Sequence, residues 1–163
     1  MVYEAIAASG STPYLTAYIA TAFLSGLLYL ILRKYKWTNV PLKFSLIHFF
    51  IVTWSGIMYL NFINGGTLLS EFGWYMDWMI STPLILLALG LTAMHGRENR
   101  WDLLGALMGL QFMLVITGII SQESGTAYAY WVGNTLLLGV IYLLWGPLRE
   151  MAKETSDVLG RSY

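Results

Sequence analysis

The stretch "EFGWYMDWMISTPLILLALGLTAM", residues 71–94, has the length and apolar content of a membrane-spanning helix and yet contains an aspartate, Asp77. A charged side chain is costly inside the hydrocarbon core of a bilayer, so such residues usually face a cavity or a cationic partner. Asp77 follows Phe72 by five residues, which at about 1.5 Å per residue places the carboxylate about 7 to 8 Å inside the membrane boundary. The stretch therefore predicts a membrane protein in which this carboxylate has a function.

The composition of the whole chain also indicates a membrane protein. Of its 163 residues, 57% are hydrophobic and 11% are charged, whereas a soluble domain carries about 25% charged residues. The absence of cysteine excludes disulfides and thiolate metal sites, and the sequence has no zinc motif, nucleotide-binding glycine loop or nucleophile elbow. Its few basic residues form no stripe suited to nucleic acid. We therefore expect neither an enzyme nor a metal site nor a nucleic-acid partner.

Five stretches are long enough to cross a bilayer, for which about 20 apolar residues are needed. They are residues 14–32, 44–63, 72–94, 103–121 and 128–148. All lysines and arginines lie in the first connection, the third connection or the tail, so the positive-inside rule places the N-terminus outside and the tail in the cytoplasm. We expect residues 1–163 to form a single transmembrane helical domain. Residues 149–163 are expected to be a cytoplasmic connection and the start of a sixth helix, which Thr155, Ser156 and Asp157 are suited to cap.

Helical spacing places Trp74 and Ser81 on the same face of the third span as Asp77. Pro83 removes a backbone hydrogen bond beside this face and should kink the helix. Eleven residues further in, where a proton path along the face would need a second carboxylate, the sequence has Ala88. A functional carboxylate is the favoured interpretation of Asp77, and an aspartate held by hydroxyl groups for helix packing is the alternative.

Other polar residues inside the spans have two interpretations. His48 lies one turn into the second span from its cytoplasmic end, where an imidazole suits a proton site, and a packing role is the open alternative. Helix packing accounts for most of a further group, which comprises Thr53, Ser55, Asn61, Gln111, Thr117 and Asn134. Gly105 and Gly109, four residues apart, permit close approach of another helix. Aromatic residues at the start of the fifth span, including Trp131, are also typical of an interfacial belt.

The stretch "WYMDWMISTPLILLALGL" resembles the third helix of microbial rhodopsins, which in pumps of the bacteriorhodopsin type reads Arg-Tyr-x-Asp-Trp-x-x-Thr-Thr-Pro. The matching positions are Tyr75, Asp77, Trp78, Thr82 and Pro83. The resemblance implies five helices of a seven-helix rhodopsin bundle, with retinal as cofactor and Asp77 as counter-ion to a protonated retinal Schiff base. It also implies a hydrogen bond between Thr82 and Gln111. The residues that it assigns to retinal binding are Tyr75, Trp78, Thr82, Gln111, Trp131, Asn134 and Leu138.

The departures from the bacteriorhodopsin pattern are informative. Trp74 replaces the arginine, Ser81 replaces the first threonine, and Ala88 occupies the proton-donor position. Together with His48 and the start "MVYEAI", these differences are similar to the xenorhodopsin branch, whose pumping members move protons inward and pair a histidine on the second helix with an aspartate on the seventh. The resemblance implies a proton pump of the cell membrane, driven by light, that assembles as a homo-oligomer, by analogy a trimer. The alternatives are a sensory rhodopsin that signals to a soluble partner and a five-span transporter subunit or scaffold without chromophore.

The position of the lysines conflicts with a complete rhodopsin. In this family the retinal lysine is in the seventh helix, whereas the lysines here lie in predicted loops or the tail, at Lys34, Lys36, Lys43 and Lys153. We therefore expect the sequence to be part of a longer rhodopsin whose sixth and seventh helices lie outside residues 1–163.

Overall fold

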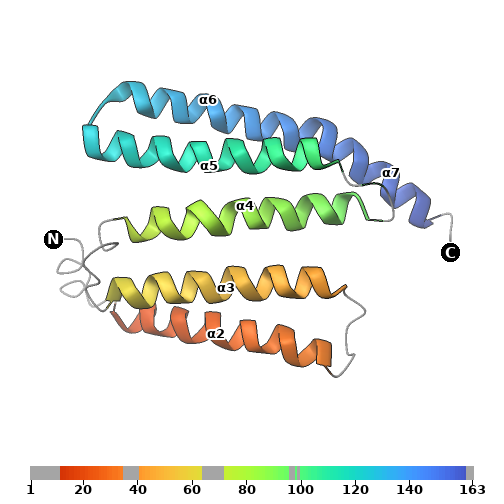
Figure 1. Cartoon of the computed structure of the whole chain (residues 1–163), viewed down its shortest axis with the longest axis horizontal. Coiled ribbons are helices and arrows are strands. Elements are labelled where there is room, and N and C mark those ends of the chain that lie inside the picture. The colour runs from red at the N-terminus through yellow and green to blue at the C-terminus, as the bar shows by residue number, and fades with distance from the viewer. Residues whose placement is uncertain (1–11, 35–40, 64–71, 96–97, 99, 161–163) are drawn as a thin grey trace. The chain divides into compact units, whose positions relative to one another are not determined.

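The computed structural model describes residues 12–34, 41–63, 72–95, 98 and 100–160, and these residues form a series of helices (Figure 1). The elements are α2 (Thr12–Lys34), α3 (Leu42–Ile63), α4 (Gly73–Ala93), α5 (Trp101–Ser124), α6 (Ala127–Leu143), the π-helical turn η1 (Leu144–Leu148) and α7 (Arg149–Gly160). Lys36, the N-terminal "MVYEAI" and the side chains of Ser156 and Asp157 lie outside the described residues.

Five of these helical segments are long and apolar enough to cross a membrane, which confirms the predicted all-α membrane fold. By length and composition the spans are Pro13–Leu32, Leu42–Asn61, Trp74–Ala93, Trp101–Ser124 and Ala127–Thr155. The fourth span is longer than predicted because it reaches a tight connection at residues 125–126, and the fifth is longer because its helix continues past Leu148. Gly125 ends α5 in the left-handed conformation, with φ of 62°, which a residue with a side chain rarely adopts. The protein is therefore a multi-pass membrane protein.

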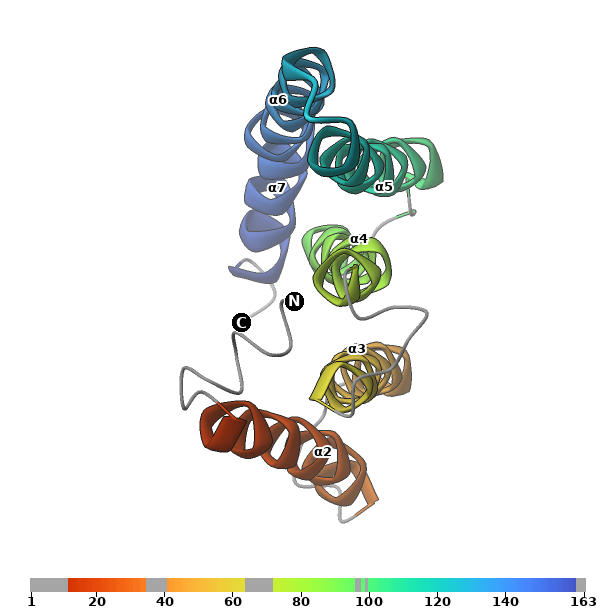
Figure 2. The ribbon, with the colours of Figure 1, turned by 90° about the vertical axis from the view of Figure 1, so that its left-hand side faces the viewer.

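The chain divides into two compact units, residues 1–81 and 82–163, and the boundary falls inside α4. In the first unit α2 lies beside α3 (Figure 1 and Figure 2). Four buried residues of α3 lie at spacings of three, four and seven and so form one stripe along the helix; they are Phe44, Ile51, Ser55 and Met58. Ser45 is also buried but lies about 100° away around the helix. This stripe is apolar except for Ser55, which makes the serine hydroxyl conspicuous.

In the second unit α5 and α6 lie side by side (Figure 2). Their close approach depends on Gly133, because a Cβ at this position would lie 2.9 Å from Thr117 Oγ1. Gly105 and Gly109 do not serve this purpose, since a Cβ at either position meets no atom within 4 Å among the described residues. The close contact between helices thus occurs at a different glycine from the pair that the sequence indicated.

The helix that begins with α6 continues through η1 into α7, so the predicted break after Leu148 is not observed. Pro147 lies inside η1, where the wider π-helical turn accommodates a residue that has no backbone N–H. Thr155 does not cap a new helix. It lies within α7, is buried, and donates a hydrogen bond of 2.7 Å to the Ala93 carbonyl at the end of α4. The last carbonyls of a helix lack partners within it, which explains why α4 accepts this bond.

Candidate functional site

The centre of the site is the Asp77 carboxylate, one turn after the start of α4. Only 5% of the residue is exposed. Its Oδ2 accepts a hydrogen bond of 2.9 Å from Ser55 Oγ on α3. Its Oδ1 is buried as well and has no hydrogen-bond partner within the described residues. Because a buried carboxylate oxygen without a donor is costly, the arrangement has capacity for a further donor or cation at Oδ1.

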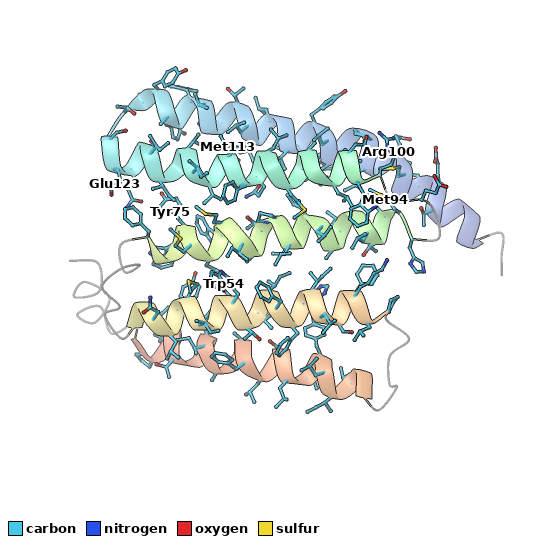
Figure 3. All side chains as sticks on the ribbon, in the orientation of Figure 1. Trp54, Tyr75, Met94, Arg100, Met113 and Glu123 are labelled. Atoms are coloured by element: carbon cyan, nitrogen blue, oxygen red, sulfur yellow. The ribbon has the colours of Figure 1, made fainter. Side chains whose placement is uncertain are left out.

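Two neighbouring residues of α3 fix the position of this part of α4. Trp54 Nε1 donates to the Met76 carbonyl at 3.3 Å, and the next residue, Ser55, donates to the next residue of α4, Asp77. Figure 3 shows the Trp54 side chain projecting from α3 toward α4. The two bonds between successive residues set the register of the two helices around the carboxylate.

The residues predicted to share the face of Asp77 lie in the same unit. Ser81 is buried, and Trp74 packs edge-on against Tyr59 of α3 with ring centroids 5.7 Å apart. Tyr75, labelled in Figure 3, contacts Trp78 edge-on with centroids 6.1 Å apart. Aromatic rings of α3 and α4 therefore pack together around the beginning of α4.

The sequence pattern indicated a helix-packing role for Ser55 and no role for Tyr18. In the structure Tyr18 Oη lies 2.8 Å from Ser55 Oγ, so a residue of α2 is linked to the Asp77 carboxylate through one serine. A signal for Ser55 was present, because it lies seven residues after His48 and therefore on the same face of α3. No comparable signal existed for Tyr18, because its contact depends on how α2 packs against α3.

His48 lies about 10 Å along α3 from Ser55, counting seven residues. Its Nδ1 is 2.8 Å from the Phe44 carbonyl oxygen, and its ring lies 5.4 Å from the ring of Tyr29 on α2. A carbonyl oxygen only accepts hydrogen bonds, so Nδ1 carries the hydrogen and Nε2 is the nitrogen that can receive a proton in the neutral ring.

The second unit contains the remaining predicted residues. Gln111 Nε2 donates to Thr82 Oγ1 at 3.1 Å, which is the contact that the rhodopsin resemblance implies. On α6, Asn134 donates to the Tyr130 carbonyl at 3.0 Å. Trp131 and Leu138, on the same side of α6 by their spacing, are 65% and 66% exposed. The roles of these residues in retinal binding stay predictions. Among the described residues no group of three or more His, Asp or Glu side chains could hold a metal ion.

Comparison with known proteins identifies the family. The family described as "Bacteriorhodopsin-like protein" matches residues 9–163. The chain belongs to the bacteriorhodopsin-like family. Members of this family bind retinal and move ions through membranes when illuminated, and they are not classical enzymes. The buried aspartate of α4 is therefore found in a family whose members bind retinal.

Individual rhodopsins show how close the similarity is. The chain is 58% identical to a xenorhodopsin whose crystal structure is described as that of an inward H⁺ pump, with a TM-score of 0.88 and coverage of 100% of this chain and 71% of that chain. This similarity confirms the predicted resemblance to the xenorhodopsin branch. Bacteriorhodopsin of Haloterrigena sp. (strain arg-4) is 33% identical over 137 residues, 73% of this chain and 53% of the relative. Archaerhodopsin-3 of Halorubrum sodomense is 34% identical over 93 residues, 55% of this chain and 34% of the relative. The matched part thus spans about a third to a half of these two curated relatives.

Proposed function

We propose that the protein is a light-driven inward proton pump that binds retinal, in which residues 1–163 contribute the first five helices. The observation that carries the proposal is the Asp77 carboxylate, whose Oδ2 is bonded to Ser55 and whose buried Oδ1 has no partner in the described part of the chain. The similarity to a xenorhodopsin described as an inward H⁺ pump supports the direction of transport.

The described residues fit a retinal Schiff base at this carboxylate. Retinal bound to a lysine supplies a cation that absorbs visible light, and Oδ1 of Asp77, which has no hydrogen-bond partner within the described residues, suits a cationic N–H donor. We propose that the chromophore is held by Tyr75, Trp78, Thr82, Gln111, Trp131, Asn134 and Leu138. The chain's lysines lie near the ends of described helices or outside them, so the retinal lysine of the whole protein is proposed to lie beyond residues 1–163.

Three positions favour inward transport. Trp74 packs on Tyr59 where outward pumps have an arginine, so it places no positive charge next to the carboxylate. Ala88 lies eleven residues after Asp77 on α4, toward the end assigned to the cytoplasm, and is buried. It offers no acid that would reprotonate the chromophore from the cytoplasm. His48 presents Nε2 as a proton acceptor on the side of α3 that the positive-inside rule assigns to the cytoplasm. Protons would therefore leave toward the cytoplasm, through His48.

We also propose a cellular location and partners for the protein. The placement of lysines and arginines supports a cell-membrane protein with its N-terminus outside. Its partners would be protons, the lipid bilayer and the sixth and seventh helices of the same protein. Rhodopsin homologues are oligomeric, and a trimer is the proposed assembly by resemblance.

Proton flux in cells that make the retinal-bound protein tests this proposal. Illumination should make the outside medium alkaline, and a protonophore should abolish the change. His48→Ala should slow or stop the flux, whereas His95→Ala, which changes the exposed histidine after α4, should leave it intact. Acidification of the medium would reverse the assigned direction. A pigment without any flux would favour the sensory rhodopsin, and the absence of a pigment would favour a membrane protein without chromophore.

A further inference from the structure

Hydroxyl groups form a directional chain from α2 to the buried carboxylate. Tyr18 Oη lies 2.8 Å from Ser55 Oγ, and Ser55 Oγ donates to Asp77 Oδ2 at 2.9 Å. A serine hydroxyl has one hydrogen to donate, and an ionised carboxylate only accepts. Because Ser55 gives its hydrogen to Asp77, Tyr18 has to give its own hydrogen to Ser55. The chain therefore runs from Tyr18 to Ser55 to Asp77 whenever the carboxylate is ionised.

Ser55 departs from the usual behaviour of hydroxyl residues in helices. Such residues often donate to the carbonyl one turn earlier on their own helix, which removes the hydroxyl from contact with other helices. The described helices contain several examples, namely Thr21 with Ala17, Thr92 with Ala88, Ser124 with Ile120 and Thr135 with Trp131. Ser55 instead donates across to α4. A different rotamer would move Oγ and break the bond from Tyr18, so this bond favours the rotamer that reaches Asp77.

The phenol ring of Tyr18 is itself held in place. Tyr59 of α3 packs against it edge-on, with ring centroids 4.9 Å apart at 67°, and Tyr59 in turn packs edge-on against Trp74 of α4. Aromatic pairs of this geometry add stability beyond the area that they bury. Two contacts thus orient Tyr18, its ring against Tyr59 and its hydroxyl against Ser55, although 46% of the residue is exposed.

We propose that Tyr18 is a positioning residue for Asp77: through Ser55 it occupies Oδ2 and leaves the buried Oδ1 as the oxygen that receives a cationic donor. The inference rests on the proposed function for the identity of that donor, the protonated retinal Schiff base. The hydrogen-bond chain can be tested without retinal. Within the described part of the chain Tyr18 forms no hydrogen bond with Asp77 itself, so its effect has to pass through Ser55.

The primary experiment is carbon-13 NMR of the protein in lipid nanodiscs, with labelled aspartate carboxyl groups and the Asp77 signal identified by its loss in Asp77→Asn. Tyr18→Phe removes only the hydroxyl and should shift the Asp77 signal. Tyr14→Phe, one turn earlier on α2 and exposed, should leave it in place. In a Ser55→Ala background Tyr18→Phe should cause no further shift, because the chain is already broken. An equal shift in both backgrounds, or none in the unmodified background, would overturn the proposal.

A reciprocal measurement covers the case in which Tyr18→Phe does not fold. With labelled tyrosine, the Cζ signal of unmodified Tyr18 should shift in Ser55→Ala, and an unchanged signal would contradict the chain. In the retinal-bound protein, Tyr18→Phe should slow light-driven flux about five-fold, which corresponds to one net hydrogen bond. If no pigment forms while the NMR results hold, the proposed function fails and the positioning role stands. If flux is normal in Tyr18→Phe or the NMR shifts are additive, the positioning role fails and the pump proposal stands.

Discussion

Replacing Gly133 by alanine should destabilise the unit formed by residues 82–163, because α5 leaves no room for a methyl group on α6. A Cβ at this position would lie 2.9 Å from Thr117 Oγ1, closer than a normal van der Waals contact. Thr117 is buried, and its hydroxyl donates to the Leu114 carbonyl at 2.7 Å. The threonine therefore cannot turn away without losing this hydrogen bond.

The expected size of the effect follows from three contributions. Overpacking of a well-packed contact costs about 1 to 3 kcal/mol. The loss of the Thr117 hydrogen bond adds about 1 kcal/mol. Alanine in place of glycine inside a helix offsets up to about 1 kcal/mol of this cost. The free energy of unfolding should therefore fall by about 1 to 4 kcal/mol.

Gly105→Ala is the matched control on α5. A Cβ at this position meets no atom within 4 Å in the described part of the chain, so only helix propensity acts. This variant should gain up to about 1 kcal/mol of stability. The assay is unfolding in mixed micelles with increasing denaturing detergent, followed by circular dichroism of the helices. Equal midpoints for the two variants, or a lower midpoint for Gly105→Ala, would refute the argument from close packing.

Three further predictions concern the carboxylate, the chromophore and α7. In the retinal-bound protein, Asp77→Asn should move visible absorption to longer wavelength, because the lost negative charge no longer stabilises the ground state; an unchanged spectrum would mean that another group neutralises the chromophore. Residues 1–163 alone should form no stable visible pigment with retinal, because none of the chain's lysines lies in the middle of a span; a stable absorption band would contradict this. Thr155→Val should lower the free energy of unfolding by about 1 to 3 kcal/mol, because it leaves the Ala93 carbonyl without its donor. Hydrogen exchange of α7 should then accelerate. Thr135→Val, at an exposed position on α6, should leave this exchange unchanged.

The sequence was sufficient for the features that depend on composition and on position within one helix. The spans follow from apolar length, and the burial of Asp77 follows from its place inside one of them. Pro83 lies within α4, as its position in the third span indicated. The contact between Thr82 and Gln111 was implied by resemblance to rhodopsins, because their separation of 29 residues gives no signal of its own.

Features that depend on packing between helices were not predicted. Predicting the bond between Tyr18 and Ser55 would require knowing how α2 packs on α3, which no sequence pattern within either helix reveals. The spacing of Gly105 and Gly109 was the visible small-residue signal, yet Gly133 makes the close contact, because spacing does not reveal which side of a helix meets its neighbour. The predicted break after Leu148 came from the change to polar residues. Backbone hydrogen bonding does not depend on that polarity, so the helix continues.

The continuous helix of residues 127–160 can be compared with the thickness of a bilayer. At about 1.5 Å per residue it is about 50 Å long, whereas the hydrocarbon core is about 30 Å thick. Counted from its first residue, about 20 residues fill the core, so the boundary falls near Pro147. Trp145 is exposed there, and the guanidinium of Arg149 lies 5.4 Å from its ring. Tryptophan and arginine both anchor helices at the level of the lipid headgroups. We therefore expect Trp145 and Arg149, at the π-helical turn, to anchor this helix at the level of the lipid headgroups.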